Sequence, residues 1–157
     1  IKSQRMRCVG VVLVLSLFCV IVQDVGACFC NGSKNNRDKY CQASFGLKAY
    51  VKNETNSSRK GERVYWITTG VKRYPTLKGN FTNVDLTKVY TAFSGALCGV
   101  TLEPGKAYLL TGFFKHVISG KVLRINLCGW TQKWKTLSQN DTCFVTSGYL
   151  TECSQKG

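Results

Sequence analysis

The chain has 157 residues, of which 44% are hydrophobic and 11% aromatic, enough to bury the core of one compact domain and too many for a disordered tail. With 22 Lys and Arg against 8 Asp and Glu, its formal net charge is +14, so anionic surfaces, glycans or acidic partners are expected to attract it. The only histidine, His116, excludes the His-Glu-x-x-His metalloproteases, and the Gly-rich nucleotide-binding motifs are missing.

Residues 1–27 have the pattern of a secretory signal peptide. Basic residues precede an unbroken apolar run at residues 9–22, and Val25-Gly26-Ala27 offers the small or apolar residues that a signal peptidase needs. The run is shorter than the roughly 20 residues of a membrane-spanning helix, which makes a signal anchor the less favoured alternative. We therefore expect translation to start at Met6, cleavage after Ala27, and a secreted, extracellular domain at residues 28–157 without membrane insertion.

Cysteines and glycosylation motifs agree with secretion. In an oxidising compartment the cysteines beyond residue 27 are expected to form disulfides before they bind a metal: Cys28, Cys30, Cys41, Cys98, Cys128, Cys143 and Cys153. Five Asn-x-Ser/Thr motifs are candidates for N-glycosylation: Asn31, Asn53, Asn56, Asn80 and Asn140.

Alternation of apolar and polar residues predicts five β-strands in the middle of the chain. The clearest is residues 45–51, where every second residue is apolar and faces inward: Phe45, Leu47, Ala49 and Val51. Similar patterns cover residues 63–71, 88–93, 107–113 and 121–128, and the last places Leu123, Ile125 and Leu127 inward. Asn53 to Gly61 is polar and predicts an exposed loop. Five short antiparallel strands indicate an all-β fold with a small closed barrel of the OB type.

After Cys128 the pattern changes. Trp130, Trp134 and Leu137 follow one another at spacings of four and three, which indicates a short helical or irregular segment laid against the barrel.

Cleavage after Ala27 would expose Cys28-Phe29-Cys30 as a new N-terminus. Its α-amine would have a pKa of about 7.7 to 8, so that a useful fraction is neutral near neutral pH and can bind a metal. The amine nitrogen and the carbonyl oxygen of one residue form a five-membered chelate, which matches the open position of a catalytic zinc. Bridging of both cysteines to the barrel would hold this terminus rigid, so that little entropy is lost on docking.

The chain resembles the N-terminal, netrin-like domain of the tissue inhibitors of metalloproteinases. The resemblance covers essentially all of residues 28–157, in a single-domain form that ends soon after Cys153. It rests on the order and spacing of six cysteines and on these motifs: Cys28-x-Cys30, Cys41, residues 44–51, Val89-Tyr-Thr-Ala92, Leu97-Cys98-Gly99, residues 108–112, residues 123–128, Trp134 and residues 149–153.

The resemblance implies an OB-fold barrel with three disulfides, whereas the sequence by itself leaves the pairing open. The implied pairs are Cys28 with Cys98, Cys30 with Cys128 and Cys41 with Cys153. It also implies that Cys28 chelates the zinc of a target protease while Phe29 enters the S1′ pocket. Further contacts implied with the target are those of Cys30, Asn31, Gly95, Ala96, Leu97 and Cys98. A catalytic residue or a cofactor of the chain's own is not expected.

Two positions depart from the family pattern. Phe29 is larger than the Thr or Ser usual there, which predicts selectivity for proteases with deep S1′ pockets. A glycan on Asn31, directly after the second cysteine, would obstruct docking.

Cys143 and His116 have no role in this scheme. For Cys143, an intermolecular disulfide or reactive thiol and a buried unpaired cysteine remain equally open. His116 lies near a Ser-Gly turn and is expected to be an exposed loop residue, with no second histidine to share a metal.

Two functions remain open. One is a secreted inhibitor of zinc metalloproteases, matrix metalloproteinases or related enzymes, which acts through Cys28 and Phe29. The other is a non-inhibitory netrin-like module that binds a receptor, a matrix protein or a sulfated glycan. The basic charge would also suit a nucleic-acid-binding OB barrel, but secretion argues against nucleic acid, and the charge can equally form a solvated face.

Overall fold

The computed structural model describes residues 28–30, 32, 34–57 and 61–154. The expected signal peptide at residues 1–27, with Met6, and the glycosylation candidate Asn31 lie outside the described residues. Among the described residues, no helix has both the length and the apolar character to span a bilayer.

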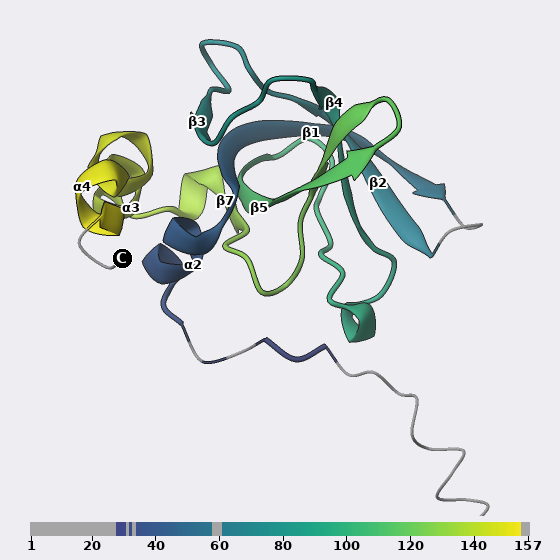
Figure 1. The fold of residues 1–157 in the computed structure, drawn as a ribbon, viewed down its shortest axis with the longest axis horizontal. Coiled ribbons are helices and arrows are strands. Elements are labelled where there is room, and N and C mark those ends of the chain that lie inside the picture. Colours follow the sequence, from purple (N-terminus) through teal and green to yellow (C-terminus); the bar gives the residue numbers. More distant parts are fainter. Residues whose placement is uncertain (1–27, 31, 33, 58–60, 155–157) are drawn as a thin grey trace, which may run out of the picture.

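Five strands form a closed ring (Figure 1). In spatial order they are β1 (Phe45–Ser57), β2 (Glu62–Thr68), β4 (Val84–Ala92), β6 (Gly120–Arg124) and β5 (Ala107–Val117), and β5 pairs again with β1. Two short strands extend the sheet, β3 (Thr76–Lys78) beside β1 and β7 (Gln132–Lys133) beside β5. This arrangement confirms the predicted fold, an OB-fold-like five-stranded barrel.

One pairing in the ring differs from the prediction. All neighbouring strands were expected to be antiparallel, but β4 and β6 run parallel, because the β5–β6 hairpin turns β6 back alongside β4 in the same direction. Alternation of residues along a strand reports its buried face and carries no information on the direction of its partner.

The main core fills the inside of the ring. Phe45, Leu47, Ala49 and Val51 are fully buried, as their spacing of two predicts. They pack with buried side chains from the other strands and from the connections after β4 and β6: Tyr65, Ile67, Val89, Val100, Leu102, Tyr108, Leu110, Leu123 and Ile125. Each large apolar side chain stabilises the fold by roughly 1.5–3 kcal/mol on burial.

The bounds of all five strands differ from the sequence prediction, by up to six residues at an end. Strand β1 continues to Ser57, which pairs with Glu62 of β2, so residues 53–57 are a strand and not the expected loop. Strand β6 stops at Arg124, and Leu127 is 49% exposed where the pattern placed it inward. Asn126 makes a turn there, which ends the alternation.

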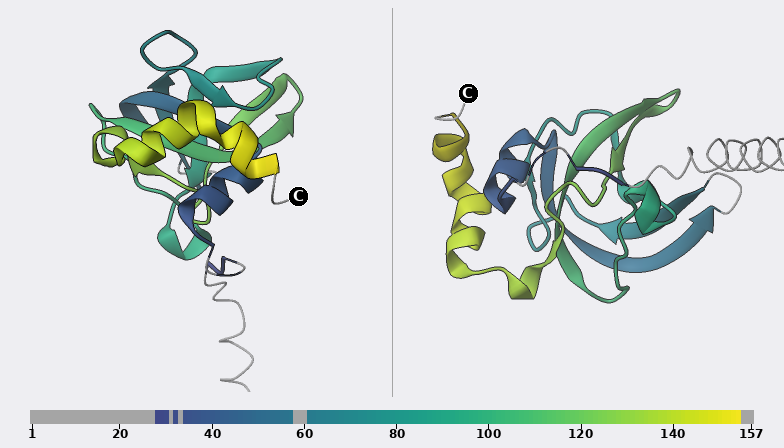
Figure 2. Two further views of the ribbon diagram at one scale, coloured as in Figure 1. Left: turned by 90° about the vertical axis from the view of Figure 1, so that its left-hand side faces the viewer. Right: turned by 90° about the horizontal axis from the view of Figure 1, so that it is seen from below.

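A second, smaller core lies between the barrel and the helices. These are α2 (Asn36–Gln42), the 3-10 turn η2 (Trp134–Thr136), α3 (Gln139–Cys143), the π-helical turn η3 (Phe144–Gly148) and α4 (Tyr149–Ser154), and α2 and the C-terminal helices lie side by side (Figure 2). Its buried members are Tyr40, Leu109, Trp130, Phe144 and Val145. Because Leu109 belongs to β5, this core confirms that the C-terminal segment packs against the barrel.

Hydrogen bonds and a disulfide fasten this helical layer. The Thr111 hydroxyl accepts from the Trp130 N–H at 2.7 Å and donates to the Trp130 carbonyl at 3.1 Å, which ties the segment after β6 to β5. A disulfide between Cys41 and Cys153 joins α2 to α4, with their Cα atoms 5.3 Å apart. Arg37 of α2 also forms an ion pair with Glu152 of α4 at 3.0 Å.

Candidate functional site

The segment of residues 28–30 is bridged to the barrel at both of its cysteines. Cys28 is joined to Cys98 and Cys30 to Cys128, with Cα–Cα separations of 4.9 and 5.3 Å. Together with the bridge between α2 and α4, these are the pairs that the family resemblance implies. Phe29 therefore has a covalent anchor on each side.

Cys98 is held by the loop that carries it. The 3-10 turn η1 (Gly95–Leu97) ends at Cys98, whose φ of 63° is left-handed and whose N–H donates to the Gly95 carbonyl at 3.0 Å. The Cys98 carbonyl accepts from the Leu127 N–H at 3.0 Å. This last bond ties the loop after β4 to the loop after β6, so the two anchors of the segment are joined to each other.

Cys128 is positioned by an Asx turn. The Asn126 side-chain oxygen accepts from the N–H groups of Cys128 at 3.0 Å and Gly129 at 3.2 Å. Asparagine often forms such turns, because its side chain bonds to the backbone two residues on. The turn before Cys128 could therefore have been predicted from the sequence.

Gly99, directly after Cys98, allows the loop to close on β4. A Cβ added to Gly99 would overlap the Ala92 carbonyl oxygen and lie 2.7 Å from the Ser94 carbonyl oxygen. Since both are backbone atoms with no freedom to move aside, only glycine fits at this position.

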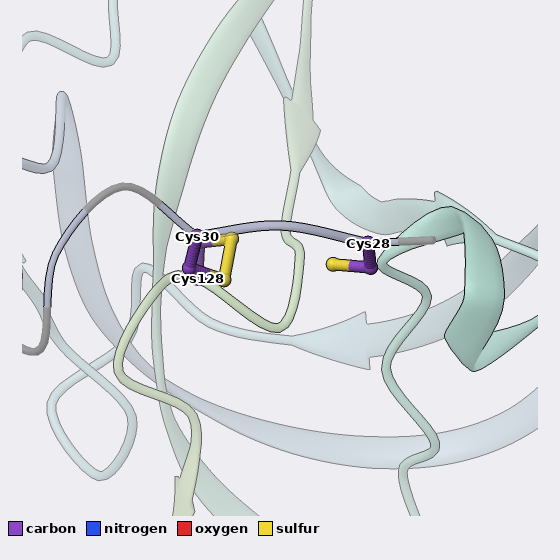
Figure 3. Close-up of side chains that lie close together, drawn as sticks. All are labelled: Cys28, Cys30 and Cys128. Atoms are coloured by element: carbon purple, nitrogen blue, oxygen red, sulfur yellow. A yellow bond between two sulfur atoms is a disulfide. The ribbon is translucent and has the colours of Figure 1, made fainter. Parts of the chain in front are cut away.

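Three cysteine sulfur atoms lie within 4.8 Å of one another, those of Cys28, Cys30 and Cys128 (Figure 3). Such a group resembles a metal site. Metal binding needs the thiolate form, however, and all three sulfurs are in disulfide bonds. The group therefore consists of adjacent disulfides, and no other cluster of potential metal ligands occurs in the part of the chain that the structure describes.

Apolar side chains around the bridged segment face solvent. Phe29 is 83% exposed, Leu97 on η1 is 60% exposed, and Phe93 at the end of β4 is 46% exposed. Gly95 and Ala96 are exposed beside Leu97. Phe29 and Leu97 each adjoin a cysteine of the Cys28–Cys98 bridge, and exposed apolar groups near one another are typical of a surface that a partner covers.

Arg63 of β2 fixes Phe93. Its guanidinium lies 5.4 Å from the centre of the Phe93 ring, forms an ion pair with Glu54 at 3.0 Å and donates to Thr101 Oγ1 at 2.7 Å. It also donates to the Tyr65 hydroxyl at 3.3 Å. Burial raises the pKa of the Tyr65 hydroxyl above its usual range. The sequence offers no signal for this contact, because the residues come from four separate segments.

Comparison with known proteins identifies the family. A family model described as "Tissue inhibitor of metalloproteinase" matches residues 26–156. The chain belongs to this family. It is 28% identical over 145 residues to metalloproteinase inhibitor 4 of Mus musculus, and 30% identical over 156 residues to metalloproteinase inhibitor 2 of Homo sapiens. These matches cover 82% and 96% of the chain and 63% and 68% of the two relatives, so the chain spans about two thirds of their length.

In this member of the tissue inhibitor family, Cys143 and His116 lie away from the bridged segment. Cys143 is a free cysteine on α3 and is exposed, so the buried alternative is wrong. The reason is that α3 turns its neighbours Phe144 and Val145 into the second core instead. His116 is exposed as expected, but it belongs to strand β5, opposite Lys121 of β6, and not to a loop.

The glycosylation candidates of this family member lie on its surface where they are described. Asn53 is exposed on β1, and Asn56 belongs to the same strand. Asn80 is exposed, and its side-chain oxygen accepts from the Thr82 hydroxyl at 2.7 Å. Asn140 is exposed on α3.

Proposed function

We propose that the chain is a secreted inhibitor of zinc metalloendopeptidases that binds the catalytic zinc of its target through Cys28. The observation that carries this proposal is the Cys28–Cys30 segment, bridged on both sides and presenting an exposed Phe29. The relatives are inhibitors by name, and an inhibitor needs no catalytic residues of its own.

Rigidity of the segment supports tight docking. Fixing the backbone of a free residue costs roughly 1–2 kcal/mol. Two disulfides and the hydrogen bond between Cys98 and Leu127 already hold residues 28–30 in place, so little of this cost remains on binding. A flexible terminus with the same atoms would bind more weakly.

The zinc chemistry depends on processing after Ala27. Removal of residues 1–27 gives Cys28 a free α-amine next to its own carbonyl, and these two atoms can occupy the open position of a catalytic zinc. A zinc whose bound water has been displaced cannot activate that water as a nucleophile. The target then holds the segment as a substrate-like wedge and does not cleave it.

Phe29 is the group that selects the target. An aromatic side chain of this size buries 150–250 Å² when a partner covers it, which favours binding by about 2–3 kcal/mol over leaving it in water. A deep S1′ pocket accommodates the ring, while a shallow one rejects it by overlap. Leu97 is also exposed and precedes Cys98, the disulfide partner of Cys28, so it can offer additional apolar contact.

A second function follows if a protease cannot reach the segment of residues 28–30. A glycan on Asn31 would stand next to Cys30 and keep a protease active site away from Phe29. The chain would then be a non-inhibitory netrin-like module that acts through other surfaces on a receptor, a matrix protein or a sulfated glycan.

One experiment separates the two functions. Processed protein that begins at Cys28 is titrated against a panel of zinc metalloproteases, beside a form with one extra alanine before Cys28 and a control with the alanine at the C-terminus. We expect nanomolar-range inhibition by the first and third forms and a loss of about 100-fold or more in the second. If none of the forms inhibits, the chain is the non-inhibitory binding module. Mass spectrometry at Asn31 would then show whether a glycan blocks inhibition.

A further inference from the structure

A groove of about 440 Å³ lies on the barrel, apart from the bridged cysteines. Four segments distant in sequence line it: Tyr50 of β1, the connection between β2 and β3 with Arg73 and Tyr74, the turn before β5 with Lys106, and the β7–η2 segment with Lys133 and Lys135. None of these residues belongs to the proposed inhibitory site, so a ligand here does not depend on inhibition.

The charges that line this groove are all positive. Arg73, Lys106 and Lys135 are exposed and form no ion pair with any described residue. Lys133 is paired with Glu103 at 2.6 Å, and Lys106 also lowers the pKa of that carboxyl. Glu103 is thus the one carboxylate near four cations, and the excess of positive charge attracts anions.

Aromatic rings form an apolar wall between these cations. The ring centres of Tyr50 and Tyr74 are 5.7 Å apart, with their planes tilted by 34°. The Arg73 guanidinium lies 5.7 Å from the Tyr74 ring centre. Cations beside aromatic rings suit a ligand that combines anionic groups with apolar faces.

A fifth cation, Lys48, lies against the aromatic rings next to the groove. The Lys48 ammonium lies 5.7 Å from the Tyr74 ring centre and 4.4 Å from that of Trp134. Burial first, and repulsion by Arg73 second, lower its pKa. A bound anion would offset this repulsion, so the groove and its surroundings favour anion binding more than a solvated face would.

We infer that this groove binds a segment of a sulfated glycan, with the sulfates on Arg73, Lys106 and Lys135 and a sugar face on Tyr50 and Tyr74. Sulfates are permanently charged and match the fixed charge of Arg and Lys. Sugar rings present C–H faces that pack on tyrosine. The choice of a sulfated glycan among polyanions rests on the proposed secretion of the chain.

A second basic face of the barrel provides the matched control. Lys88, Lys115 and Lys121 lie together on β4, β5 and β6. Glu62, Asp85 and Arg124 line the same depression, and Arg124 is ion-paired with Glu62. These carboxylates oppose an anionic ligand, so this face should contribute little, although its three lysines carry the same charge as the three groove cations.

Isothermal titration with a heparin-derived octasaccharide in about 0.15 M NaCl tests the inference. The groove variant R73A/K106A/K135A should bind about tenfold more weakly or worse, with a shallower dependence on salt, while K88A/K115A/K121A loses less than about threefold. E103Q, which frees Lys133, should bind about two- to threefold more tightly. Unchanged thermal midpoints show that the variants are folded.

Two results overturn the inference. Equal loss in both triple variants means that net charge, and not the groove, attracts the glycan, and full binding by the groove variant places the site elsewhere. A desulfated octasaccharide should bind at least about tenfold more weakly, and a single-stranded oligonucleotide of equal charge that binds more tightly than heparin would make nucleic acid the ligand class.

Discussion

At the scale of single residues, Phe29 is the side chain that we propose to select the target protease. Among the described residues it has the most exposed aromatic side chain, and disulfides on both sides keep it from folding back onto the barrel. Its size is visible in the sequence, while its exposure follows from the bridges. The family resemblance was needed to link these two facts to a protease pocket.

Replacing Phe29 should change the selectivity among proteases and leave the free energy of unfolding unchanged. We expect F29T to inhibit proteases with shallow S1′ pockets about tenfold better and those with deep pockets about tenfold worse, because only the fit of the side chain changes. Inhibition constants across a panel of both kinds measure this. A parallel shift for every protease in the panel would contradict the assignment of Phe29 to the pocket.

The requirement for glycine at position 99 cannot be seen in the sequence. A Cys-Gly pair is compatible with many turns, and only the structure places the Ala92 and Ser94 carbonyls where a Cβ would stand. We expect G99A to lower the free energy of unfolding by about 1–3 kcal/mol, as measured by chemical denaturation. G95A is the control, since a Cβ there meets nothing within 4 Å, and it should stay within about 0.5 kcal/mol of the wild type.

At the scale of elements, the sequence pattern succeeds where one face of a strand is buried. The first half of β1 alternates between the core and the outside, and its prediction is confirmed. Beyond Val51 the strand leaves the core as a hairpin arm with β2, where polar residues point both ways and the alternation disappears. Helix α2 escaped prediction because Tyr40 is its only buried residue, although Asn35 caps it by accepting from the Asp38 N–H at 2.8 Å.

The disulfides differ in whether they anchor the proposed inhibitory segment. The Cys30–Cys128 and Cys41–Cys153 bridges close loops of similar length, with sequence separations of 98 and 112, so either pair of alanine substitutions should lower stability by a similar amount, about 2–5 kcal/mol. Of these two double variants, only C30A/C128A should lose inhibition sharply, because the Cys30–Cys128 bridge anchors the segment next to Phe29 and the Cys41–Cys153 bridge does not. A C143S background prevents thiol exchange.

Inhibition assays well below the unfolding midpoint separate these two effects. Both double variants are compared at equal folded fraction, which denaturation curves provide. If C41A/C153A loses inhibition as strongly as C30A/C128A, then global stability and not local rigidity governs binding.

At the scale of the whole molecule, strand order and charge distribution come from contacts distant in sequence. Five strands and their inward faces were predictable, but the parallel β4–β6 pair was not, since it follows from how β5 closes on β1. The cations near Tyr50 and Tyr74 are scattered along the sequence and converge only through this closure. Residues 28–30 could be chosen as a candidate segment because they are contiguous in sequence, whereas their partners Cys98 and Cys128 came only from the family resemblance.

The most direct test of the central claim is the visible absorption spectrum of a cobalt-substituted target protease on titration with protein that begins at Cys28. Cobalt(II) in the zinc site reports changes in its own ligands. We predict a spectral change that saturates at one equivalent and is lost when the α-amine of Cys28 is acetylated. Inhibition with an unchanged cobalt spectrum would contradict metal binding by this residue.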